Sequence, residues 1–207
     1  MPKYPIIGMS PGNSYFKDKE VGYLLTEIIK RFGRTAIFVV DVPAIWTYLA
    51  YGYPTNKARK KAILNGNHLK NRTRRITKEL GIESNLVRIV DWENEVQNDP
   101  EYLKIYHNRV ELLYERNDDF QREVHQTTRQ VLISSGRVIE DLDSATRIAG
   151  HYLLSEIAFL EFAPQFFQEH QITYVYHKPW PIYESYISGV FDGQPRSRLD
   201  FLLLESP

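Results

Sequence analysis

Ser10 occupies a segment whose residue types suit covalent catalysis. The run G-M-S-P-G at positions 8–12 follows the apolar stretch Tyr4–Met9, and its small residues let a substrate approach the Ser10 hydroxyl closely. The run also matches the G-x-S-x-G pattern of serine hydrolases. The pattern predicts a nucleophile at Ser10. A short motif also occurs without the function, so the alternative is that Ser10 only caps a helix or closes a turn.

Tyr152 and Glu156 form a second candidate group. They are four residues apart in a predicted helix and therefore share one of its faces. A carboxylate on an apolar face is costly to bury unless it is paired or functional. Glu156 is thus predicted either to serve a functional site or to form an ion pair with Arg or Lys. The apolar residues that share its face at helical spacing are Ala145, Ile148, Ala149, Leu153, Phe159 and Leu160.

The run Tyr174-Val175-Tyr176-His177 places two phenols and an imidazole at the end of another predicted strand. Taken alone, this run fits an ordinary core strand followed by a surface residue equally well.

A basic segment is the fourth candidate. The 22 residues 57–78 contain nine Lys or Arg side chains and no acidic one, although the whole chain has 26 of each sign. Such a local field favours a phosphate backbone as partner, because nine cations without a nearby counter-charge repel one another. The alternative is a solvated helix face. The nine cations are Lys57, Arg59, Lys60, Lys61, Lys70, Arg72, Arg74, Arg75 and Lys78.

Apolar periodicity predicts the elements that would position these groups. A strand, a helix and a second buried strand at the start of the chain form a βαβ unit, which builds a parallel sheet. The fold class is therefore α/β, with one Rossmann-like domain over residues 1–207 and helices on both faces of a mainly parallel sheet. The predicted strands are Tyr4–Met9, Thr35–Val42, Leu86–Val90, Ile172–Tyr176 and Leu199–Leu204. The predicted helices are Asp18–Phe32, Asn56–Leu80, one or two within Pro100–Ser135, and Ser144–Phe162, with Pro164 just beyond the last.

Composition narrows the class of protein. A length of 207 residues suits one domain. The absence of cysteine excludes disulfides, cysteine-based zinc sites and a thiol nucleophile. The N-terminus does not resemble a signal peptide, and no apolar run is long enough to span a membrane. We expect a cytoplasmic protein without a metal or a membrane partner, with a monomer as the working expectation.

No single function class explains all four candidates. A serine hydrolase of the α/β type accounts for Ser10. That fold carries its nucleophile turn in mid-chain, however, whereas Ser10 follows the first strand, and the basic helix would have no role. A non-catalytic tRNA-binding module accounts for the basic helix but not for Ser10 or Glu156. A nucleotide-dependent enzyme is unsupported, because neither G-x-x-x-x-G-K-[ST] nor G-x-G-x-x-G occurs.

The four candidates together resemble the cyclodipeptide synthase family. The resemblance rests on the run G-M-S-P-G-N-S-Y-F at 8–16, the basic helix ending at Gly81, and P-E-Y at 100–102. It continues in Y-x-x-x-E at 152–156 and in Y-H at 176–177, in the family order over nearly the whole chain. Asn13 together with Tyr176 is similar to the branch with Asn and Tyr at those positions.

The resemblance implies a fold similar to the catalytic domain of class I aminoacyl-tRNA synthetases, without use of ATP or another cofactor. It implies an aminoacyltransferase with two aminoacyl-tRNAs as substrates. The first would acylate Ser10, the second would convert the acyl-enzyme into a dipeptidyl-enzyme, and cyclisation would release a diketopiperazine.

The resemblance also implies roles for the other site residues. Tyr152 and Glu156 would hold the ammonium of the aminoacyl group, and Tyr176 would transfer a proton during cyclisation. The residues expected to line the substrate site are Gly8, Asn13 and His177. The residues expected to contact the tRNA backbone are Lys60, Lys61, Lys70, Arg72, Arg74, Arg75 and Lys78.

The pocket for the first amino-acid side chain departs from the family pattern. Phe38, Phe159 and Tyr174 are bulkier than the small aliphatic residues of members that accept phenylalanine. The pocket is therefore predicted either to be small or to receive a polar side chain at the Tyr174 hydroxyl. The residues expected to line it are Ile6, Phe38, Val40, Phe159 and Tyr174. A second side-chain pocket is expected near Asn13, Trp180 and Pro181.

Overall fold

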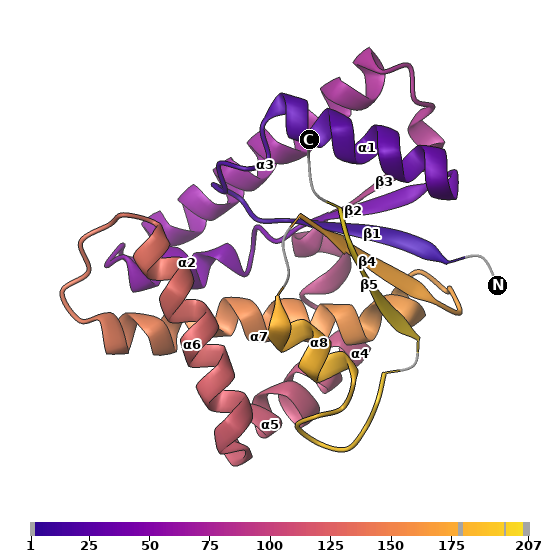
Figure 1. The fold of residues 1–207 in the computed structure, drawn as a ribbon. Helices are drawn as coiled ribbons and strands as arrows, with labels where there is room; N and C mark the ends of the chain where they lie inside the picture. The colour runs from indigo at the N-terminus through magenta and orange to yellow at the C-terminus, as the bar shows by residue number, and fades with distance from the viewer. Residues whose placement is uncertain (1–2, 178–179, 197, 205–207) are drawn as a thin grey trace.

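The fold is a five-stranded sheet between two layers of helices (Figure 1). The computed structural model describes residues 3–177, 180–196 and 198–204. The strand order is β3-β2-β1-β4-β5, and all four neighbouring pairs run parallel. The fold class predicted from the sequence is confirmed. The strands are β1 Tyr4–Met9, β2 Thr35–Val39, β3 Val87–Val90, β4 Ile172–Tyr176 and β5 Leu199–Leu203.

Helices cover both faces of this sheet, which explains why every residue of β1, β2 and β4 is buried. Figure 1 shows α1 and α3 above the sheet and α7, with α4 and α8, below it. The longer helices are α1 Asp18–Phe32, α3 Thr55–Glu79, α6 Asp118–Ser134 and α7 Leu142–Phe166. The shorter ones are α2 Ala44–Ala50, α4 Pro100–Ile105, α5 Leu112–Arg116 and α8 Pro181–Ile187. The 3-10 helix η1 spans Ser84–Leu86, and the π-helices η2 and η3 span Trp92–Val96 and Tyr106–Glu111.

Element boundaries differ from the predictions where a side chain intervenes. The charged segment predicted as one or two helices is interrupted at Asn117, whose side chain accepts a hydrogen bond from the Phe120 amide at 2.8 Å and caps α6. Asp141 caps α7 in the same way, so that helix starts earlier than predicted. The prediction that α7 ends before Pro164 was wrong, because this proline lies in the helix. The short helices α2 and α8 were not predicted, because a helical period is not recognisable over so few positions.

The chain order reverses at β1, which pairs with β2 on one side and with β4 on the other. In open α/β sheets a crevice forms at such a point, outside the carboxyl ends of the strands. Ser10 follows β1 directly, and Tyr176 is the last residue of β4. The topology therefore brings these two residues to the same edge. Among the described residues, no helix combines the length and the apolar character that a membrane span requires.

Candidate active site

A cavity of about 690 Å³ opens at this edge of the sheet. Five residues predicted from the sequence line it together: Ser10, Asn13, Tyr152, Glu156 and Tyr176. They come from the loop after β1, from α7 and from the end of β4. Ser10 and Asn13 lie more than a hundred residues from the other three in the chain, so the packing of α7 and the pairing of β4 with β1 bring the five together.

Ser10 and Tyr152 are in direct contact. The Tyr152 hydroxyl donates a hydrogen bond to Ser10 Oγ at 2.7 Å. Burial raises the pKa of Tyr152 well above its ordinary value, with the Glu156 charge adding to the rise. Tyr152 therefore remains a protonated donor, which orients the serine oxygen and does not take its proton.

Of the two alternatives for the Ser10 motif, the helix cap is not found, whereas the turn is. Helix α1 begins only at Asp18 and has Lys17 as its cap, so Ser10 caps no helix. The sharp strand-to-helix turn of a hydrolase elbow is also not formed. Instead, the carbonyl of Ser10 accepts from the Asn13 amide at 3.2 Å, and Gly12 adopts a φ of 82° in the resulting turn. The turn presents the Ser10 side chain to the cavity.

Glu156 is a buried carboxylate held by two phenols. The Tyr174 hydroxyl donates to its Oε1 at 2.8 Å, and the Tyr183 hydroxyl donates to its Oε2 at 2.7 Å. Burial raises the pKa of Glu156, and the two phenols oppose that rise. No Lys or Arg in the described part of the chain forms an ion pair with it. The ion-pair alternative is therefore not found among these residues.

Tyr183 is the functional candidate that the sequence did not identify. It lines the cavity and supports Glu156 from the short helix α8. A single tyrosine after Pro181 carries no pattern that distinguishes it from other core aromatics, so no sequence signal pointed to it.

Tyr176 is almost completely buried beside the nucleophile. Burial raises the pKa of the Tyr176 phenol, and the Glu156 charge raises it further, while side-chain hydrogen bonds with Ser10, Trp180 and Asn13 oppose the rise. The phenol is thus a proton donor at neutral pH. The adjacent His177 does not line the cavity, and its ring stacks on Tyr15 with 3.6 Å between centroids. The side chain of His177 thus lies against the loop after β1, and its contact with the substrate stays a prediction.

The five residues expected to line the first side-chain pocket lie in the core instead. None of them lines the cavity, and each is completely buried: Ile6, Phe38, Val40, Phe159 and Tyr174. Gly8 lies beneath them, and a Cβ placed on it would approach the Tyr174 hydroxyl to 2.5 Å. The glycine therefore makes room for a phenol of the protein rather than for a substrate, which corrects the sequence interpretation.

Lys70 corrects the prediction for the basic helix most clearly. Its ammonium lies 2.8 Å from the Asp41 carboxylate, and the two side chains are 8% and 1% exposed. Burial raises the pKa of Asp41, and Lys70 opposes the rise. Because the pair is buried beneath α3, Lys70 does not reach a ligand at the surface of the helix.

Other cations of α3 also have counter-charges, supplied by segments outside residues 57–78. Arg72 and Arg75 both contact Asp18 at the start of α1, at 3.1 and 2.8 Å, and Arg59 pairs with Glu93. The premise that these cations lack nearby carboxylates was therefore wrong, since the sequence does not show which acids fold against the helix.

Four exposed cations of α3 form no ion pair with a described residue. One of them, Lys57, lies 5.3 Å from the Tyr53 ring. The other three are Lys60, Arg74 and Lys78. Spacings of 14 and 4 residues place them close to one stripe along the helix. Lys61 is half-buried and lines the cavity that contains Ser10.

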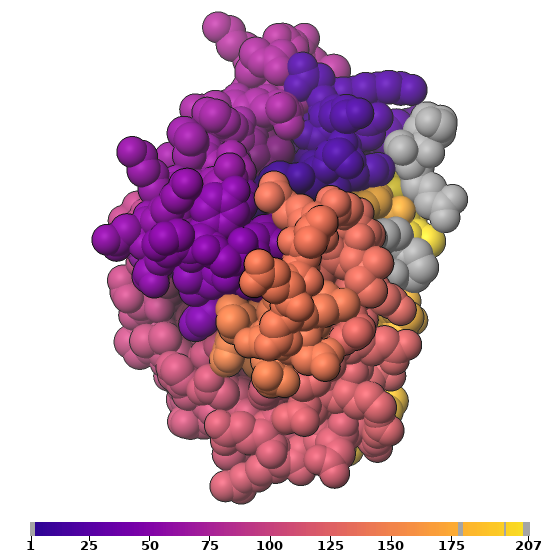
Figure 2. Space-filling view, turned by 90° about the vertical axis from the view of Figure 1, so that its left-hand side faces the viewer, coloured from indigo at the N-terminus to yellow at the C-terminus, as the bar shows by residue number. Residues whose placement is uncertain are grey.

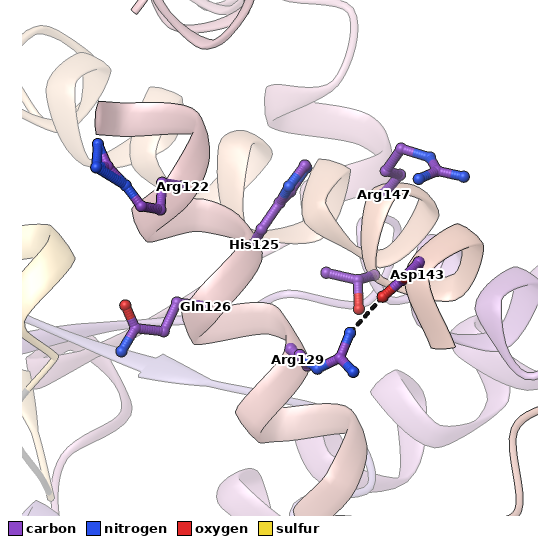
Figure 3. A pocket seen from close by; sticks show the side chains of 7 residues that line it. Arg122, His125, Gln126, Arg129, Asp143 and Arg147 are labelled. Atoms are coloured by element: carbon purple, nitrogen blue, oxygen red, sulfur yellow. Dashed lines mark hydrogen bonds and ion pairs between the residues drawn. The ribbon is translucent and has the colours of Figure 1, made fainter. Parts of the chain in front are cut away.

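A second cavity of about 380 Å³ lies between α6 and α7 and contains none of the predicted residues (Figure 3). Figure 3 shows Arg129 of α6 bridged to Asp143 of α7 across it. The other lining residues are Arg122, His125, Gln126, Thr146 and Arg147. Within the described ranges, no three His, Asp or Glu side chains are grouped closely enough to hold a metal ion.

Comparison with known proteins adds independent findings. The sequence model of the family "Cyclodipeptide synthase" matches residues 3–205. A relative from Streptomyces noursei, a cyclo(L-leucyl-L-phenylalanyl) synthase, is 26% identical over 181 residues, which are 87% of this chain and 75% of the relative.

Solved structures share the fold. The chain is similar to a Mycobacterium tuberculosis protein whose structure relates cyclodipeptide synthetases to type I tRNA synthetases, with a TM-score of 0.77, 19% identity, and coverage of 97% and 84% of the two chains. It is also similar to a cyclodipeptide synthase from Candidatus Glomeribacter gigasporarum bound to Phe-tRNAPhe, with a TM-score of 0.66, 18% identity, and coverage of 100% and 89%.

Proposed function

The chain belongs to the cyclodipeptide synthase family, and from this premise we propose that it joins the amino acids of two aminoacyl-tRNAs through esters on Ser10. The observation that carries the proposal is a cavity in which Ser10 contacts Tyr152 and in which the buried Glu156 has phenols as its only side-chain partners among the described residues. The family match over residues 3–205 supports one catalytic domain. Asn13 and Tyr176 both line this cavity, which supports the branch assignment made from the sequence.

In the first step, Ser10 Oγ attacks the ester carbonyl of an aminoacyl-tRNA. The bond to the terminal ribose oxygen breaks, and this oxygen receives the proton that the serine loses. A serine hydroxyl is a weak nucleophile, but an aminoacyl ester is an activated acyl donor. Tyr152 contributes by fixing the position of Oγ.

Glu156 and Tyr152 then hold the α-ammonium of the acyl group. A buried carboxylate without a cationic partner favours a ligand that supplies one. Tyr174 and Tyr183 fix both carboxylate oxygens, so the charge is positioned before the substrate arrives. The raised pKa of Glu156 also suits it to take a proton from the ammonium when that nitrogen has to react.

In the second step, the freed amine attacks the ester of the second aminoacyl-tRNA. Its tRNA leaves, and a dipeptide remains on Ser10. The terminal amine of this dipeptide then attacks the Ser10 ester, which closes the ring and regenerates the hydroxyl. Tyr176 lies beside Ser10 and is a protonated phenol, so it can donate its proton to the leaving serine oxygen and regain one from the attacking amine.

The first amino acid has a small side chain in this proposal. Phe38, Phe159 and Tyr174 fill the space expected for it, and the Tyr174 hydroxyl is engaged by Glu156. These contacts favour the small pocket over the polar one, because the Tyr174 hydroxyl already donates its single proton in the hydrogen bond to Glu156.

The exposed stripe of α3, formed by Lys60, Arg74 and Lys78, is proposed to contact the tRNA backbone. The solved relative bound to Phe-tRNAPhe supports tRNA as the partner. Contacts of this kind position the RNA without reading its sequence.

Expression in a bacterial host, with mass spectrometry of the medium, tests the proposal. We expect a new cyclic dipeptide from the wild-type chain and at least about a thousandfold less from Ser10→Ala. The matched control is Ser14→Ala, which removes another hydroxyl of the same cavity and retains covalent labelling by radiolabelled aminoacyl-tRNA.

Labelling that persists in Ser10→Ala would identify another nucleophile. The absence of any cyclic dipeptide, both in cells and with a full set of aminoacyl-tRNAs in vitro, would contradict the proposed reaction.

A further inference from the structure

Three tyrosines and two cations form a cluster at the cavity that contains Ser10. We call Tyr48, Tyr51, Tyr53, Lys61 and Arg137 the tyrosine–cation cluster. The first three belong to α2 and the turn after it, Lys61 to α3 and Arg137 to the loop between α6 and α7. Figure 2 shows this loop, in orange, lying against the purple atoms of the α2–α3 region.

The rings and cations of the cluster are in mutual contact. The Tyr48 ring lies 5.8 Å from Tyr53 and 6.5 Å from Tyr51, in edge-on geometry. The Lys61 ammonium lies 5.9 Å from the Tyr48 ring and 5.4 Å from the Tyr53 ring. The Arg137 guanidinium lies 4.7 Å from the Tyr51 ring. The cluster therefore joins α3 to the loop on the other side of the cavity.

The cluster is continuous with the nucleophile loop. Tyr48, Tyr51, Lys61 and Arg137 all line the same cavity as Ser10. A Cβ placed on Gly12 would lie 3.6 Å from the Tyr48 hydroxyl, so the turn that presents Ser10 rests against this tyrosine. A molecule that delivers an acyl group to Ser10 therefore shares the cavity with these side chains.

The cations of the cluster carry no carboxylate partner. Unlike Arg59 and Arg75 of α3, neither Lys61 nor Arg137 forms an ion pair with any described residue. The pKa of the Tyr53 phenol is lowered, first by Lys61 and then by Arg137, which reflects a positive local potential. Cation–π contacts at exposed sites are weak, so an anionic ligand can displace them.

We propose that the tyrosine–cation cluster binds the unpaired 3′-terminal nucleotides of the aminoacyl-tRNA, with Tyr51 as a stacking platform and Lys61 and Arg137 on the phosphates. This inference rests on the proposed function. The amino acid is esterified to the terminal ribose, so the last nucleotides lie at the cavity when the ester reaches Ser10. Unpaired bases stack on aromatic side chains, and cations neutralise the phosphates between them.

Fluorescence anisotropy with two RNAs tests this site. One is an intact uncharged tRNA and the other is the same tRNA without its last three nucleotides. We expect the wild-type chain to bind the intact tRNA about tenfold more tightly, as stacking of one or two bases provides. Tyr51→Ala removes most of this ratio, whereas Tyr51→Phe retains it because the ring remains. Arg137→Gln reduces the ratio more at low salt than at high salt.

The matched control is Lys78→Gln, on the exposed stripe of α3, which weakens both RNAs alike and leaves the ratio unchanged. Circular dichroism verifies that each variant is folded. Equal wild-type affinity for the two RNAs, or a ratio that survives in folded Tyr51→Ala, would overturn the 3′-terminal site. Diketopiperazine synthesis is measured separately, and its detection would in that case leave the proposed reaction intact. Failure to bind either RNA would overturn the tRNA partner as well.

Discussion

The sheet-edge site and helix α3 treat charge in opposite ways. At the sheet edge, one buried carboxylate, Glu156, is held by the neutral hydroxyls of Tyr174 and Tyr183. On α3, several cations are held by carboxylates of other segments, and the buried Lys70 is paired with Asp41. Among the described residues, Glu156 has no cationic partner, whereas four of the nine cations of α3 have a carboxylate partner: Arg59, Lys70, Arg72 and Arg75.

This difference shows where a ligand can act. A buried ion that already has its counter-ion is part of the structure, whereas a buried ion satisfied by phenols retains affinity for a cation. By the same reasoning, the cations proposed to contact RNA are those that form no ion pair with a described residue, such as Lys60 and Lys78 on the exposed stripe and Lys61 at the cavity. Density of charge in the sequence does not distinguish these cases.

The greatest change is expected from breaking the buried ion pair between Lys70 of α3 and Asp41. Lys70→Met leaves Asp41 buried without a partner, and we expect a loss of about 3–5 kcal/mol in the free energy of unfolding, measured with urea. Lys60→Met, at an exposed position of the same helix, should leave that free energy within about 0.5 kcal/mol. Adding Asp41→Asn to Lys70→Met should recover part of the loss. A stable Lys70→Met single variant would contradict the structural role of the pair.

The second prediction sharpens the contrast between two carboxylates of α7. Glu156→Gln removes the charge that meets the substrate ammonium, and we expect kcat/KM for diketopiperazine formation to fall about 100-fold with the fold intact. Glu161 is the matched control, because it already pairs with Arg109 and Arg196 and accepts from Tyr186. Glu161→Gln should lower the melting temperature and retain synthesis. Unfolding of Glu156→Gln would instead indicate a structural carboxylate.

The pH dependence of Glu156 has opposite signs for stability and for activity. Burial raises its pKa above the ordinary value of 4.5, so the folded chain holds this proton more tightly than the unfolded chain. The free energy of unfolding contributed by Glu156 therefore falls as pH rises from 4.5 to the raised pKa. Activity should rise through the same window, because only the carboxylate binds an ammonium. Parallel titration of wild type and Glu156→Gln measures both, and a shared slope in the variant would contradict the assignment.

A smaller change is expected when cations are removed from the exposed stripe of α3, formed by Lys60, Arg74 and Lys78. Lys60→Glu combined with Lys78→Glu should weaken tRNA binding about tenfold and reduce the dependence of log K on log salt by about two contacts. Arg72→Gln and Arg75→Gln, which remove cations already paired with Asp18, should change the binding less. Equal effects of both pairs would mean that pairing with carboxylates does not decide which cations contact RNA.

Much of the fold could be predicted from local patterns. The bounds of β1, α1 and β4 agree with the prediction, because apolar runs and helical spacing are set within a few residues. The predicted group Ser10, Tyr152, Glu156 and Tyr176 does line one cavity. Tyr183 and Lys70 could not be assigned correctly, because the function of each depends on a partner distant in the sequence.

Local sequence patterns were enough to predict the α/β class, the position of Ser10 after the first strand and the shared face of Tyr152 and Glu156. These follow from the periods of strands and helices and from the rule that places ligands at the carboxyl edge of a parallel sheet. Which charged side chains lack a counter-charge among the described residues became apparent only from the folded chain. The same holds for Gly8, which makes room for Tyr174 rather than for a substrate. The physical reason is that burial and electrostatic pairing depend on contacts between distant segments, and composition within one segment does not contain them.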